Sequence, residues 1–507
     1  MKSGKRRRSH FHSIFAIIFL MLLALTTQGQ TNVQKAKATG ESKTEEKPGN
    51  DVEQLKSRLE HLQSLIEQQQ RAMTEMQKRI DELDEKTRVA AVAPAALKVD
   101  AATAAQTQKS DSPSSPVAGD KDKDKDKPVI LAGWDRNHAF LRSADGAFET
   151  QFTGYGQLDF RGYQSGNHPP NTYLVRRARL ALEGKLQRYF DFKVEGDFAD
   201  TTSTLLRDFY GRIHRTDEIQ FSFGQFRVPI SQEEIRSDAF QDFVERSMVN
   251  NLVPSRSPGL MVSGTINKGV FEYQIGSFNG KGLLAQNNNG TPENAIRLRF
   301  APGKNGKQFW AKGFIFGGAF TQGRSFLGAG VRGQTESRSI SWYAPDTING
   351  KYIRANGEFT WLLGPAAIRA EYDQTNQQRQ NLGVAGRDLP GVVAKGFTAQ
   401  ITYLLTGETK PEAGAVAPKH NLFGDEAGKT GFGAWELKAR YTKLQISNGT
   451  SKSNHAETIF FGPNVYFNRF VRYVLDLGFE RFNDPARSPN PRDKNFFVVL
   501  SRIQVAF

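Results

Sequence analysis

The stretch Phe190-Asp191-Phe192-Lys193-Val194-Glu195-Gly196-Asp197-Phe198 alternates apolar or small residues with charged ones at every position. Side chains of a β-strand point alternately to its two faces, so this order predicts a strand with one apolar face and one charged face. The same alternation recurs in residues 397–405, 435–442 and 471–479. More than a dozen such segments follow one another, with no second class of element between them, so an all-β fold is expected.

Two all-β architectures fit these segments. A soluble sandwich would bury the apolar faces, whereas a transmembrane barrel would turn them to lipid and the polar faces to a wet lumen. Aromatic residues at segment ends, and short connections such as Gly364-Pro365 that alternate with longer ones at 374–388 and 410–431, favour the barrel. Residues 129–507 then give a transmembrane antiparallel barrel of about 16 strands, at roughly 20–25 residues per strand and connection.

Three different segments precede this barrel. Residues 1–30 begin with basic residues and continue with an apolar run too short to span a bilayer, which predicts a secretory signal peptide. Residues 31–50 form a polar linker. Residues 51–88 carry apolar residues at alternating spacings of three and four, which predicts a coiled-coil helix, with a lone amphipathic helix as the alternative. Residues 89–128 end in a Lys-Asp repeat and predict a disordered linker.

Composition excludes several classes of function. The chain has no cysteine, so neither disulfides nor thiolate metal sites can form. The net charge is +15, but no nucleic-acid motif accompanies it, and an exported protein is not expected to bind nucleic acid. Five histidines follow residue 128, and no two of them have metal-ligand spacing, so we expect no metal, no cofactor and no enzyme activity. The mean hydropathy of −0.53 argues against a bundle of membrane helices.

Several motifs resemble those of the phosphate-selective porin O and P family. They are Arg176-Arg177-Ala178-Arg179-Leu180, residues 193–198, residues 224–230 with Glu245-Arg246-Ser247, residues 404–408 and residues 433–441, and they extend from about residue 150 to the C-terminus. The resemblance implies a 16-stranded barrel, a homotrimer and passive diffusion across the bacterial outer membrane. In the type members it also implies an arginine- and lysine-lined route for phosphate.

The end of the chain also resembles a known signal. Ile503-Gln504-Val505-Ala506-Phe507 is an alternating strand that ends in phenylalanine. A terminal strand of this kind resembles the signal that the outer-membrane insertion machinery reads, so this machinery and outer-membrane lipid are expected partners.

Basic residues that would face the lumen are the candidates for solute binding, because arginine donates two hydrogen bonds to phosphate in fixed geometry. Residues 232–258 lack alternation and form a candidate constriction loop folded into the lumen, and residues 324–338 form a second basic loop. On residues 174–183, Arg176 falls on the lipid-facing parity together with Leu174. The candidates are Arg177 and Arg179, then Arg212, then Arg236, Arg246 and Arg256 of the constriction loop, and Arg324, Arg332 and Arg338 of the second loop.

The sequence therefore predicts an outer-membrane porin through which small solutes diffuse. A preference for anions such as phosphate is one hypothesis. A general porin, in which lumen charges balance one another, is the other, because Asp191, Glu195, Asp197 and Asp208 lie near the arginines. The alternative to a transport function is a structural one, in which the protein is a tether whose coiled coil reaches across the periplasm. The solute itself is not encoded in any motif.

Overall fold

The computed structural model describes residues 130–135, 138–164, 169–199, 205–424, 428, 430–449, 454–484 and 494–507. The predicted signal peptide, polar linker, coiled coil and disordered linker therefore lie outside the described residues. Among the residues that are described, no helix is both long enough and apolar enough to cross a bilayer.

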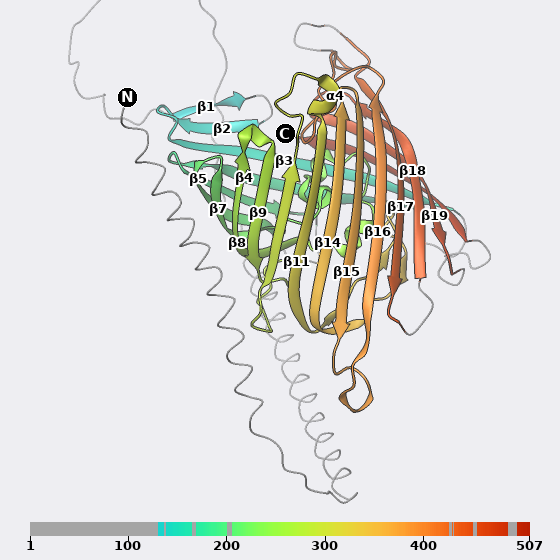
Figure 1. Cartoon of the computed structure of the whole chain (residues 1–507). Coiled ribbons are helices and arrows are strands. Elements are labelled where there is room, and N and C mark those ends of the chain that lie inside the picture. Colours follow the sequence, from blue (N-terminus) through green and yellow to red (C-terminus); the bar gives the residue numbers. More distant parts are fainter. Residues whose placement is uncertain are drawn as a thin grey trace, which may run out of the picture. The chain divides into compact units, whose positions relative to one another are not determined.

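The described part of the chain forms a sheet of 18 strands, of which 16 close into an antiparallel barrel (Figure 1). The two others, β1 (Ile130–Asp135) and β2 (His138–Ser143), form a hairpin beside the first barrel strand. The barrel strands are β3 (Phe148–Tyr163), β4 (Thr172–Leu186), β5 (Phe190–Asp197), β6 (Leu206–Thr216), β7 (Ile219–Arg227), β8 (Arg256–Ile266), β9 (Phe271–Phe278), β10 (Glu293–Phe300), β11 (Phe314–Ala329), β14 (Thr347–Leu363), β15 (Ala366–Arg379), β16 (Leu389–Leu404), β17 (Ala434–Ser447), β18 (Asn454–Tyr466), β19 (Val471–Phe482) and β20 (Asn495–Ala506).

Pairing of the last strand with the first closes the ring. The register between β20 and β3 extends from Val498 opposite Tyr163 to Ala506 opposite Tyr155. The backbone of Phe507 then exchanges two further hydrogen bonds with Gly154. Closure leaves no unpaired edge between these strands, as a sheet in lipid requires. The prediction of an antiparallel barrel of about 16 strands is confirmed.

The strands turn their apolar faces outward. On β17, Trp435 and Leu437 are exposed at 41% and 49%, whereas Glu436 and Lys438 between them are at most 4% exposed. A soluble sandwich would show the opposite arrangement, with the apolar side chains buried. The alternation therefore describes a barrel with an apolar outer surface and a charged interior.

Connections at the two ends of the barrel differ in length. The end called here the turn side has short connections at residues 187–189, 217–218, 364–365 and 467–470. The opposite end, the loop side, has the long connections 228–255, 279–292 and 330–346. The expectation that residues 410–431 would be a loop on that same side is wrong. They lie in the connection between β16 and β17, which is on the turn side because an even number of strands separates it from the short turns.

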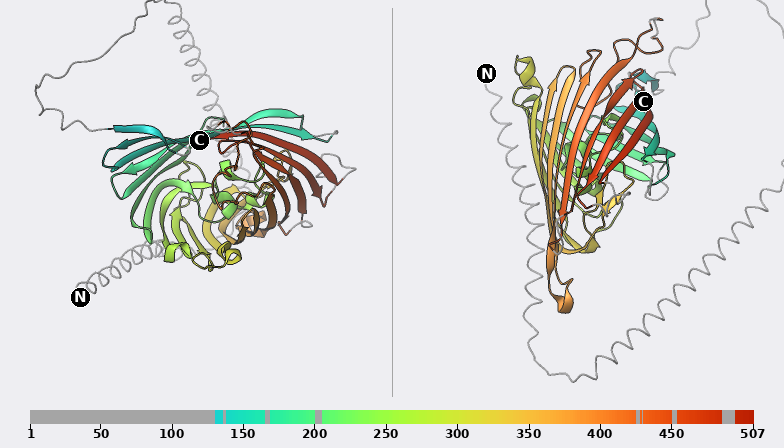
Figure 2. Two further views of the ribbon diagram at one scale, coloured as in Figure 1. Left: turned by 90° about the horizontal axis from the view of Figure 1, so that it is seen from above. Right: turned by 90° about the vertical axis from the view of Figure 1, so that its right-hand side faces the viewer.

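Two of the loop-side connections fold into the barrel. Residues 228–255, called here the constriction loop, contain α3 (Gln232–Ile235) and the short 3₁₀ helices η1 (Asp238–Phe240) and η2 (Met248–Leu252). Seen from above, this loop lies inside the ring of strands (Figure 2, left). Residues 330–346 carry the small hairpin of β12 (Gly333–Gln334) and β13 (Ser341–Tyr343) and pack beside it.

An apolar core joins these two connections to the barrel wall. Phe243 and Trp342, each 1% exposed, belong to one buried cluster with the inward side chains of β17, β19 and β20, among them Leu444, Phe482 and Phe496. The expectation that inward faces are polar is therefore wrong at the loop end of these strands. Their inward side chains contact protein rather than water, so burial of apolar area stabilises the loop.

Replacing Phe243 by alanine should loosen the constriction loop. The ring is buried and lies under two cations, with Lys438 Nζ and the Arg440 guanidinium carbon 4.8 and 4.1 Å from its centre. Truncation of such a side chain costs about 3–5 kcal/mol. Limited digestion with trypsin should cut the loop of the Phe243→Ala variant at Arg236 or Arg246 and leave the wild type intact. The variant Phe326→Ala, at an outward-facing site that is 57% exposed, serves as the control and should resist digestion.

Candidate functional site

A cavity of ≈ 610 Å³ opens between the constriction loop, the loop ends of β4 to β8 and residues 329–345. We call it the loop-side cavity. Eight of its lining residues are arginines and three are acidic, a surplus of five positive charges. The arginines are Arg176, Arg177, Arg179, Arg207, Arg246, Arg256, Arg332 and Arg338, and the acids are Asp197, Glu234 and Asp238.

A β-bulge places two adjacent arginines in this cavity. In the pairing of β4 with β3, Arg177 lies opposite Gln157 but Val175 lies opposite Leu158, so Arg176 is an extra residue without a partner. Because of the bulge, the residues before it point to the opposite face of the barrel wall from the one that simple alternation predicts. Val175 is 57% exposed on the outside, and the lipid-facing placement of Arg176 and Leu174 is wrong. Period-two alternation alone cannot show such an insertion.

The carboxylate of Glu245 in the constriction loop pairs with four arginines, three of which line this cavity. Its side chain is 1% exposed. Its carboxylate oxygens lie 2.5 Å from Arg161, 2.6 Å from Arg176, 3.0 Å from Arg338 and 3.9 Å from Arg177. One carboxylate therefore holds guanidinium groups from β3, β4 and the connection after β11 against the loop.

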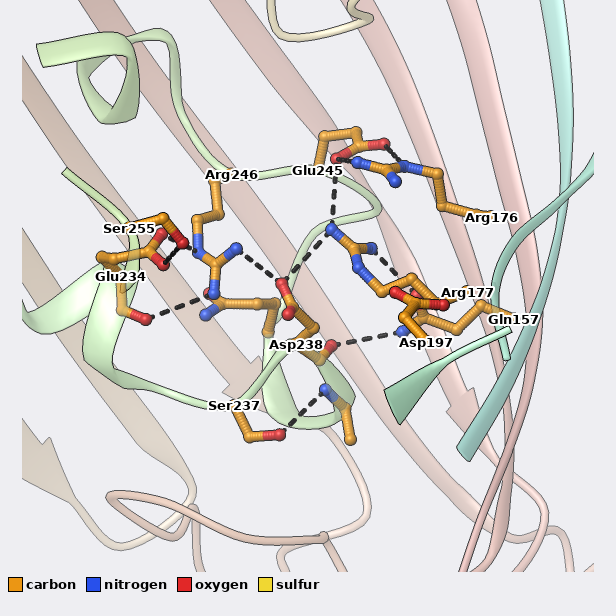
Figure 3. Close-up of polar contacts among 12 residues, drawn as sticks. Gln157, Arg176, Arg177, Asp197, Glu234, Ser237, Asp238, Glu245, Arg246 and Ser255 are labelled. Atoms are coloured by element: carbon orange, nitrogen blue, oxygen red, sulfur yellow. Dashed lines mark hydrogen bonds and ion pairs between the residues drawn. The ribbon is translucent and has the colours of Figure 1, made fainter. Parts of the chain in front are cut away.

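Asp238 is a second centre of the same kind. Its carboxylate lies 2.5 Å from Arg246, 2.8 Å from Arg179, 3.3 Å from Arg177 and 3.4 Å from Arg227. Figure 3 shows the Arg177 guanidinium between Asp238 and Glu245, so the two centres share one cation. Gln157 on β3 also binds the loop, donating to the Asp238 carbonyl oxygen at 3.2 Å.

Asp242 anchors the other face of the loop. It accepts contacts from Lys410 at 2.8 Å, Arg236 at 2.9 Å and Arg369 at 3.2 Å. Lys410 comes from the connection between β16 and β17 and also pairs with Glu436. The connection between β16 and β17 thus extends from the turn side into the lumen and contacts the turn-side face of the constriction loop.

A second cavity of ≈ 350 Å³ lies on the turn side of the constriction loop. Its charges are close to balance. Its lining contains Arg236, Arg297, Arg299 and Arg369 against Glu233, Glu371 and Glu412. Since the constriction loop lines both cavities, it lies between a strongly basic compartment and a nearly neutral one.

The structure brings together most, but not all, of the predicted site residues. Arg177, Arg179, Arg246, Arg256, Arg332 and Arg338 line the loop-side cavity, and Arg236 lines the turn-side cavity. Arg256 is the first residue of β8 rather than part of the loop, and contacts Asp208 at 2.6 Å and Glu195 at 3.3 Å. The predicted loop end at residue 258 is therefore two residues inside the strand.

Two predicted residues lie elsewhere. Arg212 on β6 packs on the ring of Tyr210, 5.6 Å from its centre, and lines neither cavity. Arg324 is not in a loop but on β11, where it is exposed on the outer surface at the same parity as Phe320 and Phe326. Its expected role in the pore lining is wrong, because β11 extends five residues beyond it and keeps its side chain outside.

The sequence did not single out the three acids that organise the loop. Asp238, Asp242 and Glu245 follow one another at spacings of four and three, in a segment without strand alternation. This regular spacing of acidic residues was the pattern in the sequence that could have identified them. Arg161 and Arg227 were also missed, although strand parity alone places Arg161 on the same face as Asp159. In the described part of the chain, no cluster of histidine and acidic residues is arranged to hold a metal.

Comparison with known families identifies the chain. Residues 151–507 match the family model of phosphate-selective porin O and P. The chain belongs to this family. It is therefore an outer-membrane porin, and the resemblance seen in its motifs is confirmed. No curated protein matches the chain in sequence.

Solved structures of several outer-membrane proteins resemble the porin in fold. OmpT of Vibrio cholerae, in its trimer form, is 12% identical with a TM-score of 0.47, over 71% of this chain and 100% of that one. The outer membrane channel DcaP of Acinetobacter baumannii is 11% identical with a TM-score of 0.47, over 74% and 100%. The anion-selective porin from Comamonas acidovorans is 12% identical with a TM-score of 0.44, over 71% and 99%. Because these scores are below 0.5, the assignment rests on the family match.

The constriction loop should stay docked in mild acid. Burial by itself raises the pKa of Asp238, but Arg177, Arg246, Arg179 and Arg227 together hold it well below its ordinary value of 3.8. A group with a lowered folded-state pKa stabilises the fold at every pH above its unfolded value, and this stabilisation is lost only as the pH falls through the folded value. Open-channel current noise of the wild type should therefore be unchanged between pH 7 and about pH 4.

The Asp238→Asn variant is the matched control for this measurement. It cannot ionise, so its four arginines lose their shared carboxylate, and its noise should be high at every pH. Noise that already increased in the wild type at pH 5 would show that Asp238 does not hold the loop.

Proposed function

We propose that this porin passes small solutes by diffusion with a preference for anions, including phosphate. The observation that carries the proposal is the surplus of five positive charges in the lining of the loop-side cavity. A narrow compartment with an excess of one charge sign, bounded by low-dielectric walls, raises the local concentration of counter-ions. Anions are expected to enter it more readily than cations of the same size.

The geometry of the cations favours oxyanions in particular. Arg332 and Arg338 are exposed and lie at the wall of the cavity formed by residues 329–345. Within the described residues no carboxylate pairs with Arg332, so its guanidinium is available to a solute. Guanidinium groups do not lose their charge at physiological pH and can donate paired hydrogen bonds to phosphate oxygens.

A general porin with balanced charges is the competing hypothesis. The turn-side cavity, with four arginines and three carboxylates, fits that description. Around the loop-side cavity, however, Asp238 of the lining and Glu245 of the constriction loop are each shared by four arginines. Sharing neutralises fewer cations than one-to-one pairing would, which favours the anion preference.

Reversing the charge of Arg332 should weaken the anion preference. The Arg332→Glu variant changes the charge of the cavity by two units. At roughly 8 Å in water, this changes the energy of a monovalent ion by about 1 kcal/mol, or about five-fold in relative permeability. Reversal potentials in planar bilayers, with a salt gradient of potassium chloride, measure this ratio directly.

The variant Arg324→Glu is the control. It changes the charge by the same two units, but on the outer surface of the barrel, and should keep the wild-type reversal potential. A cation-selective reversal potential in the wild-type porin would refute the anion preference. Equal effects of the two variants would show that the loop-side cavity does not determine selectivity.

We also propose that the porin forms a homotrimer, as its family resemblance implies. The predicted coiled coil at residues 51–88 would then join three copies through its apolar stripe. The mass of the purified porin in detergent should be that of three chains. Deleting residues 31–127 should leave conductance intact and weaken the trimer, and an unchanged trimer would assign the association to the barrel alone. Loss of envelope attachment in the same variant would instead favour the tether hypothesis.

A further inference from the structure

The outward face of the barrel carries an apolar band with aromatic ends. On β17 it extends from Trp435 at the turn side to Tyr441, and on β19 from Val471 to Phe479. The second distance is about 26 Å along the strand at 3.3 Å per residue. An apolar band of about 25 Å is what an outer-membrane barrel presents to lipid. Tyr441 and Phe479 therefore mark the level at which the bilayer interior ends on the loop side.

On three strands the first outward position beyond this level is basic. On β17 the next outward residue after Tyr441 is Lys443, and on β19 the next after Phe479 is Arg481. On β16, Lys395 follows Phe397 in the same direction. We call the outward basic residues near the loop end of β11 to β19 the basic belt. They are Arg324, Lys351, Lys395, Lys443 and Arg481.

Strand register arranges the belt residues in two directly paired groups, with Lys395 on a strand between them. Arg324 lies directly opposite Lys351 in the pairing of β11 with β14. Glu457 on β18 lies between Lys443 and Arg481, opposite both. Lys395 lies between Gln374 on β15 and Gln445 on β17. Gln374 lies opposite Ala355 on β14, two outward positions from Lys351.

The belt has few compensating charges of its own. Glu457 is the one outward carboxylate on the described part of these strands at this level, and it binds Lys443 at 2.7 Å. No carboxylate among the described residues forms an ion pair with Arg324, Lys351 or Lys395, and all three are exposed. Five cations and one anion thus face outward, where no lumen solute can reach them.

We propose that the basic belt binds the phosphate groups of anionic glycolipid in the outer leaflet of the outer membrane. In an outer-membrane barrel the long loops face the cell exterior, so the belt lies at the headgroup level of that leaflet. Clustered lysine and arginine at a membrane surface attract anionic headgroups, and guanidinium groups bind phosphate oxygens directly. The proposal is independent of the lumen and of the anion preference.

The test uses the full-length porin and the variant Arg324→Gln/Lys351→Gln/Lys395→Gln, extracted in mild detergent. Phosphorylated lipid A retained per chain is measured by mass spectrometry. Loss of three surface cations should lower retention by roughly ten-fold or more. The matched control is Arg215→Gln/Lys307→Gln/Lys312→Gln, which removes three exposed cations from the turn side and should retain as much lipid as the wild type. Equal retention by the belt variant and the wild type would overturn the proposal.

A second measurement needs no variant. The wild-type porin is reconstituted in phosphatidylcholine vesicles that contain either diphosphorylated lipid A or its dephosphorylated form. The unfolding temperature should be higher with the phosphorylated lipid, and 10 mM inorganic phosphate should not remove the difference, since the belt binds phosphates held in the membrane. Equal unfolding temperatures would refute the proposal, and loss of the difference in free phosphate would assign binding to small anions instead.

Discussion

Buried ion pairs between the constriction loop and the barrel wall are the interaction on which the rest of the interior depends. A carboxylate in a protein interior is costly unless it is paired and hydrogen-bonded. Asp238, Asp242 and Glu245 meet that condition only because cations from several strands converge on each of them. The loop therefore cannot move without leaving charges unpaired on both sides. The same arrangement leaves more arginines than carboxylates in the loop-side cavity.

The interior is divided between apolar packing and water-accessible charge. At the loop end of β17, β19 and β20 the inward side chains pack against Phe243 and Trp342 as a protein core would. On the side of β4 to β8, arginines line open space. The core fixes the loop in position, and the ion pairs fix its orientation. A solute path along the arginine side is consequently bounded by a rigid loop rather than by a flexible one.

Period-two alternation predicted the strand class, the closed barrel and the inward facing of Arg177 and Arg179 because these follow from local geometry alone. The motifs predicted the family because they too are short stretches of consecutive residues. Features that depend on pairing between strands could not be predicted from a single sequence. The bulge at Arg176 changes facing without changing composition, and the outward position of Arg324 depends on where β11 ends. The contacts of Lys410 depend on which end of the barrel its connection occupies.

The inward-folded loop also has a consequence for the order of assembly. The backbone N–H of Val244 donates to Asp476, and the Gln241 carbonyl accepts from Arg472, across sequence separations of 232 and 231 residues. Contacts so distant along the chain form slowly, because the entropy of closing the intervening segment must be lost first. The loop emerges from the ribosome well before β19 does. It must remain unattached, with its acids and arginines in water, until the last strands have joined the barrel.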